Sequence, residues 1–151
     1  MKKILLIGIC IASLYSCKEE PKKEELLITE NMAFDSILNN YYEESLKLYP
    51  LNATSQGDTR YNDILPNNLT DEFRATENEF YSNFQQKLAT IKDETLTPSQ
   101  QMSKEILQWE CDRNLERLTF REDLHPLDQM WTMQLMMGQL ASGGSSQPFK
   151  T

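Results

Sequence analysis

The sequence predicts an all-α protein, and three observations support this prediction. Valine is absent from the 151 residues. Four of the nine isoleucines lie within the first eleven residues, so β-branched aliphatic side chains, which favour strands, are rare in the rest of the chain. Elsewhere, apolar residues recur at helical spacing between well-marked helix stops. We therefore expect three to four antiparallel helices.

The overall charge restricts the classes of function that are open to the chain. It holds 23 Asp and Glu residues against 15 Lys and Arg residues, a net charge of −8. A general nucleic-acid binder needs a clustered basic surface, so we expect no nucleic-acid partner. The single histidine, His125, supplies too little for a zinc site or a Ser–His enzyme. We expect no catalytic residue, no metal site and no cofactor in this chain alone.

Residues 1–16 have the features of a lipoprotein signal peptide. Two lysines precede an uncharged run over residues 4–16, which is shorter than the ~20 residues that span a membrane. The run leads into Leu14-Tyr15-Ser16-Cys17, which resembles a bacterial lipobox. This pattern predicts lipidation of Cys17 and hence anchoring to a membrane through lipid. The alternative is an ordinary signal peptide in which Cys17 is incidental.

Residues 17–28 are predicted to form a charged tether. Charged runs that contain a proline are typical of solvated linkers. Lys18-Glu19-Glu20 after the cysteine is similar to the surface-export signal of Bacteroidetes lipoproteins. We therefore expect the protein in the cell envelope, lipid-anchored in the outer membrane of a Gram-negative bacterium. Once Cys17 is acylated and the signal peptide is removed, only Cys111 remains, and one cysteine cannot form an internal disulfide.

Residues 29–151 form the predicted helical body, which opens with a helix from Thr29 to Tyr49. Thr29 can act as its N-cap, and Pro50 disfavours helical geometry at the residue before it. Its apolar face has helical spacing and consists of Phe34, Ile37, Leu38, Tyr41, Ser45 and Leu48. The next segment is rich in turn-forming residues and is predicted to be irregular, with Gly57 available for a positive φ.

A second helix is predicted from Thr70 to Lys92. Thr70 caps it, and acidic residues occupy the first turn, where the helix dipole favours them. Its apolar face consists of Phe73, Phe80, Phe84, Leu88 and Ile91.

A third helix opens at Thr97, which can form a capping box with Gln100, and Pro98 takes the first helical position. Its predicted buried face consists of Met102, Ile106, Trp109, Leu115 and Leu118. Cys111 lies off this stripe, so we expect it to be a passive residue.

The stretch from Leu127 to Leu140 is rich in methionine and tryptophan, with five such residues in fourteen. A helix that is apolar nearly all round should be buried on several sides, so a core helix is one interpretation. The other is an adaptable docking face, because methionine re-packs easily. The candidate interaction face consists of Met130, Trp131, Met133, Met137 and Leu140.

Four short motifs follow one another along the chain. Pro50-Leu51-Asn52-Ala53-Thr54-Ser55-Gln56-Gly57 has the pattern P-x-x-A-T-x-x-G. Tyr61-Asn62-Asp63-Ile64-Leu65-Pro66 supplies a tyrosine and a D-x-L-P-like element. His125-Pro126-Leu127 and the tail Gln147-Pro148-Phe149-Lys150-Thr151 come later. Together, in this order, the motifs resemble the N-terminal region of a large bacterial family, the one named domain of unknown function 885.

The resemblance implies a longer, mostly helical lipoprotein that is similar to zinc metallopeptidases of the carboxypeptidase Taq type. Their H-E-x-x-H-like zinc motif lies in the C-terminal part, and this chain has no such motif, so no catalytic residue can be transferred to it. The resemblance therefore implies an incomplete, non-catalytic N-terminal segment of a larger helical fold. Its partners would be the missing C-terminal helices of the same protein, and zinc is expected only there. The alternative is a stand-alone helical surface lipoprotein that binds a peptide, glycan or protein partner.

Overall fold

The computed structural model describes residues 20–124, 130 and 132–143. Within these ranges every regular element is an α-helix or a short 3-10 helix, which confirms the all-α prediction. The helices are α2 (Glu20–Leu48), α3 (Pro50–Ser55), α4 (Asp71–Ala89), α5 (Pro98–Arg117) and α6 (Met133–Ala141), with 3-10 turns η1 (Asp93–Thr95) and η2 (Glu122–Leu124). None of the described helices is both long and apolar enough to cross a membrane.

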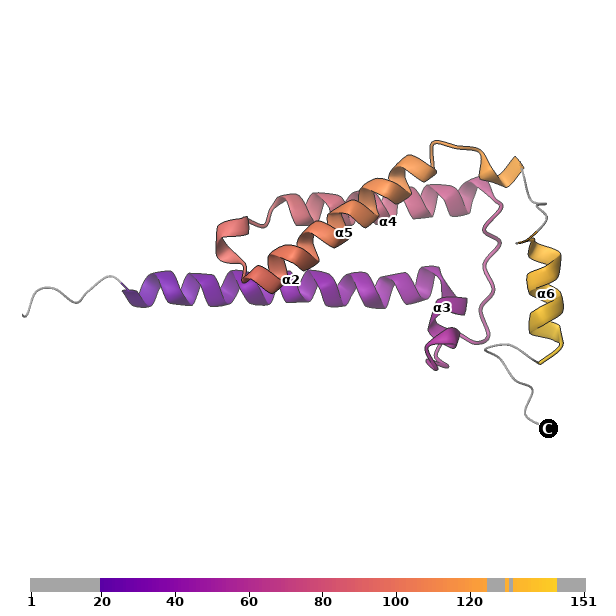
Figure 1. Ribbon diagram of the computed structural model, residues 1–151, viewed down its shortest axis with the longest axis horizontal. Coiled ribbons are helices and arrows are strands. Elements are labelled where there is room, and N and C mark those ends of the chain that lie inside the picture. The colour runs from indigo at the N-terminus through magenta and orange to yellow at the C-terminus, as the bar shows by residue number, and fades with distance from the viewer. Residues whose placement is uncertain (1–19, 125–129, 131, 144–151) are drawn as a thin grey trace, which may run out of the picture.

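Helices α2, α4 and α5 form the body of the molecule. The chain reverses direction after α3, so that α4 returns along α2, and it reverses again through η1, so that α5 lies along α4 (Figure 1). The short helix α3 packs at the end of α2, and α6 stands beyond that end, across the direction of α2 (Figure 1). The first turns of α2 project past the other helices (Figure 1).

An aromatic-rich core joins the three long helices. Phe34 from α2, Phe84 from α4 and Cys111 from α5 are each 0% exposed. The ring of Tyr41 packs edge-on against Phe84, with centroids 5.1 Å apart. Fully burying one such side chain contributes about 1.5–3 kcal/mol, so these rings dominate the stability of the body.

Helix α2 begins earlier than predicted and ends where predicted. It starts at Glu20, so Thr29 lies inside the helix and is not its N-cap. Residues 20–28, which precede Thr29, are mostly charged and contain one helix breaker, Pro21. Because Pro21 lies in the first turn of the helix, where proline is tolerated, the helix can begin before Thr29. At the other end, Tyr49 leaves helical geometry with φ −124° and ψ 72°, as expected before Pro50.

The segment after Tyr49 was predicted to be irregular, and this prediction is wrong for α3. Pro50 occupies the first turn of this helix, where its missing N–H costs no hydrogen bond. The chain then leaves the helix through Gly57, whose φ of +83° confirms the predicted positive φ.

The predicted caps of α4 and α5 are both present. Thr70 Oγ1 accepts a hydrogen bond from Phe73 N at 3.2 Å. Thr97 Oγ1 accepts from Gln100 N at 3.3 Å, and Gln100 Oε1 accepts from Thr97 N at 3.1 Å, which completes the capping box. Helix α4 ends at Ala89, earlier than the predicted Lys92.

The predicted buried face of α5 is wrong. Three of its members are exposed: Met102 (63%), Ile106 (58%) and Trp109 (64%). The buried residues of α5 are instead Leu107 and Cys111, and Leu118 at its C-cap is buried as predicted. Helix α5 has apolar residues at helical spacing on two opposite sides, so periodicity alone could not identify the side that faces the core.

Candidate functional site

A hollow of about 830 Å³ separates α6 from the adjacent parts of α4 and α5, and we call it the α6 groove. Polar side chains of Tyr49, Glu77 and Arg117 line one side of it. The α6 side presents Met130, Leu135 and Met136 together with polar Thr132 and Gln134, and Phe73 lies on the α4 side beside Tyr49. The groove therefore offers a polar floor and a wall in which adaptable apolar side chains alternate with polar ones.

The floor is built around the buried carboxylate of Glu77, which is 5% exposed. Tyr49 Oη donates a hydrogen bond to Glu77 Oε1 at 2.6 Å. Arg117 Nη2 donates to the same oxygen at 2.8 Å and so forms an ion pair between α5 and α4. A buried carboxylate without such donors would be strongly unfavourable, so the two hydrogen bonds offset the loss of water around Glu77.

A second tyrosine extends this network. Because the one hydroxyl hydrogen of Tyr49 goes to Glu77, Tyr81 donates the bond that joins the two phenolic oxygens at 2.9 Å. Burial raises the pKa of Tyr49 well above its usual value, and the bond to Glu77 raises it further. Burial also raises the pKa of Tyr81. Both phenols are therefore neutral at physiological pH and act as hydrogen-bond donors.

Arg117 remains a cation although it is partly buried. Burial acts to lower its pKa, but attraction to Glu77 and hydrogen bonds to Glu77 and Glu122 outweigh burial and raise it. Its Nη1 donates to Glu122 Oε2 at 3.2 Å. The guanidinium thus connects a buried carboxylate with an exposed one at the edge of the groove.

Two smaller hollows adjoin the groove. One, of about 420 Å³, is polar and is lined by Tyr41, Tyr81 and Glu110 among others. Burial raises the pKa of Tyr41, and a hydrogen bond with Glu110 adds to this effect. The other, of about 470 Å³, is mainly apolar and lies between α3, the loop before α4, and Met136 and Met137 of α6. Helix α6 therefore has uncovered apolar space on two sides.

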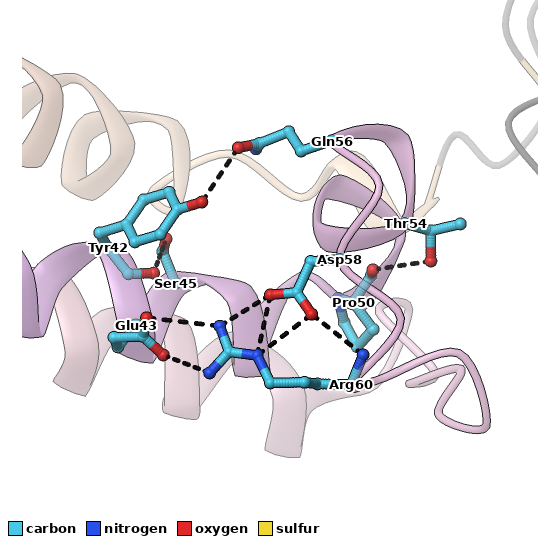
Figure 2. Close-up of polar contacts among 8 residues, drawn as sticks. All are labelled: Tyr42, Glu43, Ser45, Pro50, Thr54, Gln56, Asp58 and Arg60. Carbon is cyan, nitrogen blue, oxygen red and sulfur yellow. Dashed lines mark hydrogen bonds and ion pairs between the residues drawn. The ribbon is translucent and has the colours of Figure 1, made fainter.

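The motif Pro50–Gly57 and the residues after it have structural roles next to this site. Ala53 is 0% exposed, and buried Thr54 donates from Oγ1 to Asn62 Oδ1 at 2.8 Å. Figure 2 shows how the exposed Arg60 ties the loop back to α2.

The guanidinium of Arg60 joins two carboxylates, with Nη1 bonded to Glu43 Oε2 at 2.8 Å and Nη2 to Asp58 Oδ2 at 2.7 Å. The bonds from Arg60 lower the pKa of Asp58. Exposed ion pairs of this kind contribute little to stability, so their main effect is to fix the position of the loop.

The structure places the described members of the predicted interaction face at different sites. Met130 precedes α6 and lines the groove, whereas Met137 lines the apolar hollow and Leu140 is half-buried. Met133 is the first residue of α6, and Trp131 lies outside the described residues, as does the predicted lipidation site Cys17.

Helix α6 covers only the later part of the apolar stretch from Leu127 to Leu140. Thr132 Oγ1 accepts a hydrogen bond from Leu135 N at 3.4 Å, so Thr132 is the N-cap and α6 begins one residue later. This threonine lies inside the Met- and Trp-rich stretch, where its capping role was overlooked. His125 lies outside the described residues.

Sequence reasoning also missed Glu77, although a pattern could have revealed it. Glu77 lies at the helical spacing of Phe73, Phe80 and Phe84, on the face of α4 that was predicted to be buried. A lone charged residue at a core position indicates a buried ion pair, since charged side chains are seldom fully buried without a partner.

The described part of the site can bind and orient a ligand through hydrogen bonds, charge and apolar contact. Burial raises the pKa of the Cys111 thiol to about 11, and the nearby Glu110 and Asp112 add to this effect, so the thiol is unreactive at neutral pH. Within the described ranges, no three His, Cys, Asp or Glu side chains are grouped as metal ligands. Comparison of the chain with protein-family models, curated proteins and solved structures found no match.

Proposed function

We propose that this chain is a non-catalytic, helical N-terminal portion of a lipid-anchored protein similar to zinc metallopeptidases, and that its α6 groove forms one wall of a peptide-binding cleft. The observation that carries the proposal is the mixed lining of the groove, in which Glu77 and Arg117 form a polar floor and methionine and leucine side chains occupy part of the α6 wall. A peptide has polar backbone groups and variable side chains. The polar floor suits the former, and the methionine and leucine wall can re-pack around the latter.

The parent protein is proposed from the resemblance described above. In such a protein the C-terminal part would hold the zinc, and the metal would supply an activated water for peptide hydrolysis. Arg117 would hold and orient a bound peptide, and α6 would shield it from water. The proposed anchor is lipid on Cys17, which would place the groove in the cell envelope of a Gram-negative bacterium, at the outer membrane.

The peptide-binding claim is tested with two leucines that differ in position. Leu135 lines the groove and is 52% exposed, whereas Leu124 is 64% exposed and does not line it. We expect Leu135→Asp to weaken binding of a fluorescent peptide library roughly tenfold, because it places a charge in the apolar wall. Leu124→Asp should leave binding unchanged. Equal effects of the two variants, or no binding by the wild-type chain, would contradict the claim.

The claim about the parent protein has a separate test in the gene. The DNA downstream of codon 151 should continue, in one of the three forward frames, into a sequence with an H-E-x-x-H-like motif. A stop codon with no related frame would rule out the peptidase-like parent and leave the peptide-binding claim intact.

The second candidate function is a stand-alone surface lipoprotein that captures a peptide, glycan or protein. One observation favours it: the described residues line the groove on both sides without a further segment. A cooperative, monomeric thermal unfolding transition together with peptide binding by this chain alone would favour this candidate. An uncovered fragment should instead bind hydrophobic dye and associate.

A further inference from the structure

An apolar stripe runs along the face of α5 that points away from the core, and we call it the outer stripe. It consists of Met102, Ile106 and Trp109, which follow one another at i, i+4 and i+7 and are 63%, 58% and 64% exposed. The core residues of the same helix, Leu107 and Cys111, lie on the opposite side. Tryptophan is among the residues that most often anchor protein interfaces, so this face has the composition of a docking surface.

Acidic side chains flank the outer stripe on both sides. When the stripe is placed at heptad positions a and d, Glu105 and Asp112 occupy g positions and Glu110 an e position. Among the residues that the structure describes, neither Glu105 nor Asp112 has an ion-pair partner, and Asp112 accepts only from the amides of Gln85 and Gln108. This charge is therefore available to a partner.

The same charges disfavour a second copy of the chain as the partner. In an antiparallel helix pair, g positions face g positions, so Glu105 and Asp112 would meet their own counterparts. In a parallel pair, Glu105 would face Glu110 of the other copy. Like charges at these positions are destabilising, so a partner with basic flanks fits better.

We infer that the outer stripe docks an amphipathic helix whose own apolar stripe is flanked by lysine or arginine. Trp109 and Ile106 pack between the apolar residues of the partner helix, in the helix-to-helix mode of recognition. Glu105 and Asp112 pair with its basic flanks and select it over acidic helices. This surface is separate from the α6 groove, so the inference holds whether or not the groove binds peptide.

The experiment uses the full chain in nanodiscs of neutral phosphatidylcholine, with empty nanodiscs as the blank. Two fluorescent peptides of about three heptads carry leucine at a and d, and either lysine or glutamate at e and g. The lysine peptide should bind, and the glutamate peptide should bind roughly tenfold more weakly or not at all.

Matched variants locate the binding. Ile106→Asp should weaken binding of the lysine peptide roughly tenfold, because it places a charge in the middle of the stripe. Phe120→Ser is the control, since Phe120 is similarly exposed at 62% but lies outside the stripe. Circular dichroism should show native helix content for both variants. The double variant Glu105→Lys/Asp112→Lys should reverse the preference in favour of the glutamate peptide.

Several results would overturn the inference. These are equal affinity for the two peptides, no binding of either, binding that Ile106→Asp leaves intact, and a preference that the double lysine variant leaves unchanged. A dimer that Ile106→Asp dissociates would show that a second copy occupies the stripe instead.

Discussion

Arg117 extends from α5 to α4, where it is one of two donors to a single buried oxygen of Glu77. We expect Arg117→Met to lower the free energy of unfolding by about 2 kcal/mol, because it leaves a buried carboxylate short of a partner. This figure is below that for a fully buried pair, since the Arg117 side chain is 34% exposed. Urea denaturation followed by circular dichroism measures the change.

Arg113→Met provides the control for this prediction. Arg113 pairs with Glu116 on the surface of the same helix, where both side chains are largely exposed, so its loss should change stability by about 0.5 kcal/mol or less. The double variant Glu77→Gln/Arg117→Met should recover part of the loss, because it removes the buried charge itself. An equal loss of unfolding free energy in Arg117→Met and Arg113→Met would show that the Glu77–Arg117 pair stabilises the protein no more than an exposed pair does.

At the scale of elements, two glycines provide opposite tests of backbone conformation. Gly57 follows α3 with φ +83°, a value that other residues adopt at a cost, so Gly57→Ala should destabilise the protein by about 1 kcal/mol.

Gly138 lies inside α6, and a Cβ there would meet nothing within 4 Å. Gly138→Ala should therefore stabilise α6 by about 1 kcal/mol. Hydrogen exchange of the α6 amides and thermal unfolding measure both changes, and the same sign for both would refute this account.

The elements also show what could be predicted from the sequence. The caps at Thr70 and Thr97 were predictable, because a capping side chain acts within one turn of its own helix. The buried side of α5 was not, because its choice depends on which neighbours pack against it, and these are distant in sequence. The network of Tyr49, Glu77 and Arg117 was missed for the same reason, since its members come from three separate segments.

At the scale of the whole molecule, the anchoring proposal predicts that Cys17 alone accepts lipid. In a Gram-negative host, the wild-type chain should incorporate labelled palmitate and sediment with the membranes. Cys17→Ser should lose the label, because the acceptor thiol is gone, whereas Cys111→Ala should keep it, since Cys111 is buried in the core. Palmitate on the Cys17→Ser variant would contradict the proposal.

The length of α2 determines how far the helical body would lie from a membrane that anchors the chain at Cys17. The helix begins at Glu20, three residues after Cys17, and its first turns project past the other helices (Figure 1). Among the residues of α2 whose burial the structure describes, Phe34 is the first in the core. At ~1.5 Å per residue, this projecting part measures about 20 Å. A chain anchored at Cys17 would thus carry its helical body on a stiff stalk, about two-thirds as long as the hydrocarbon core of a bilayer is thick. Its groove would then be open to ligands that never touch the headgroups.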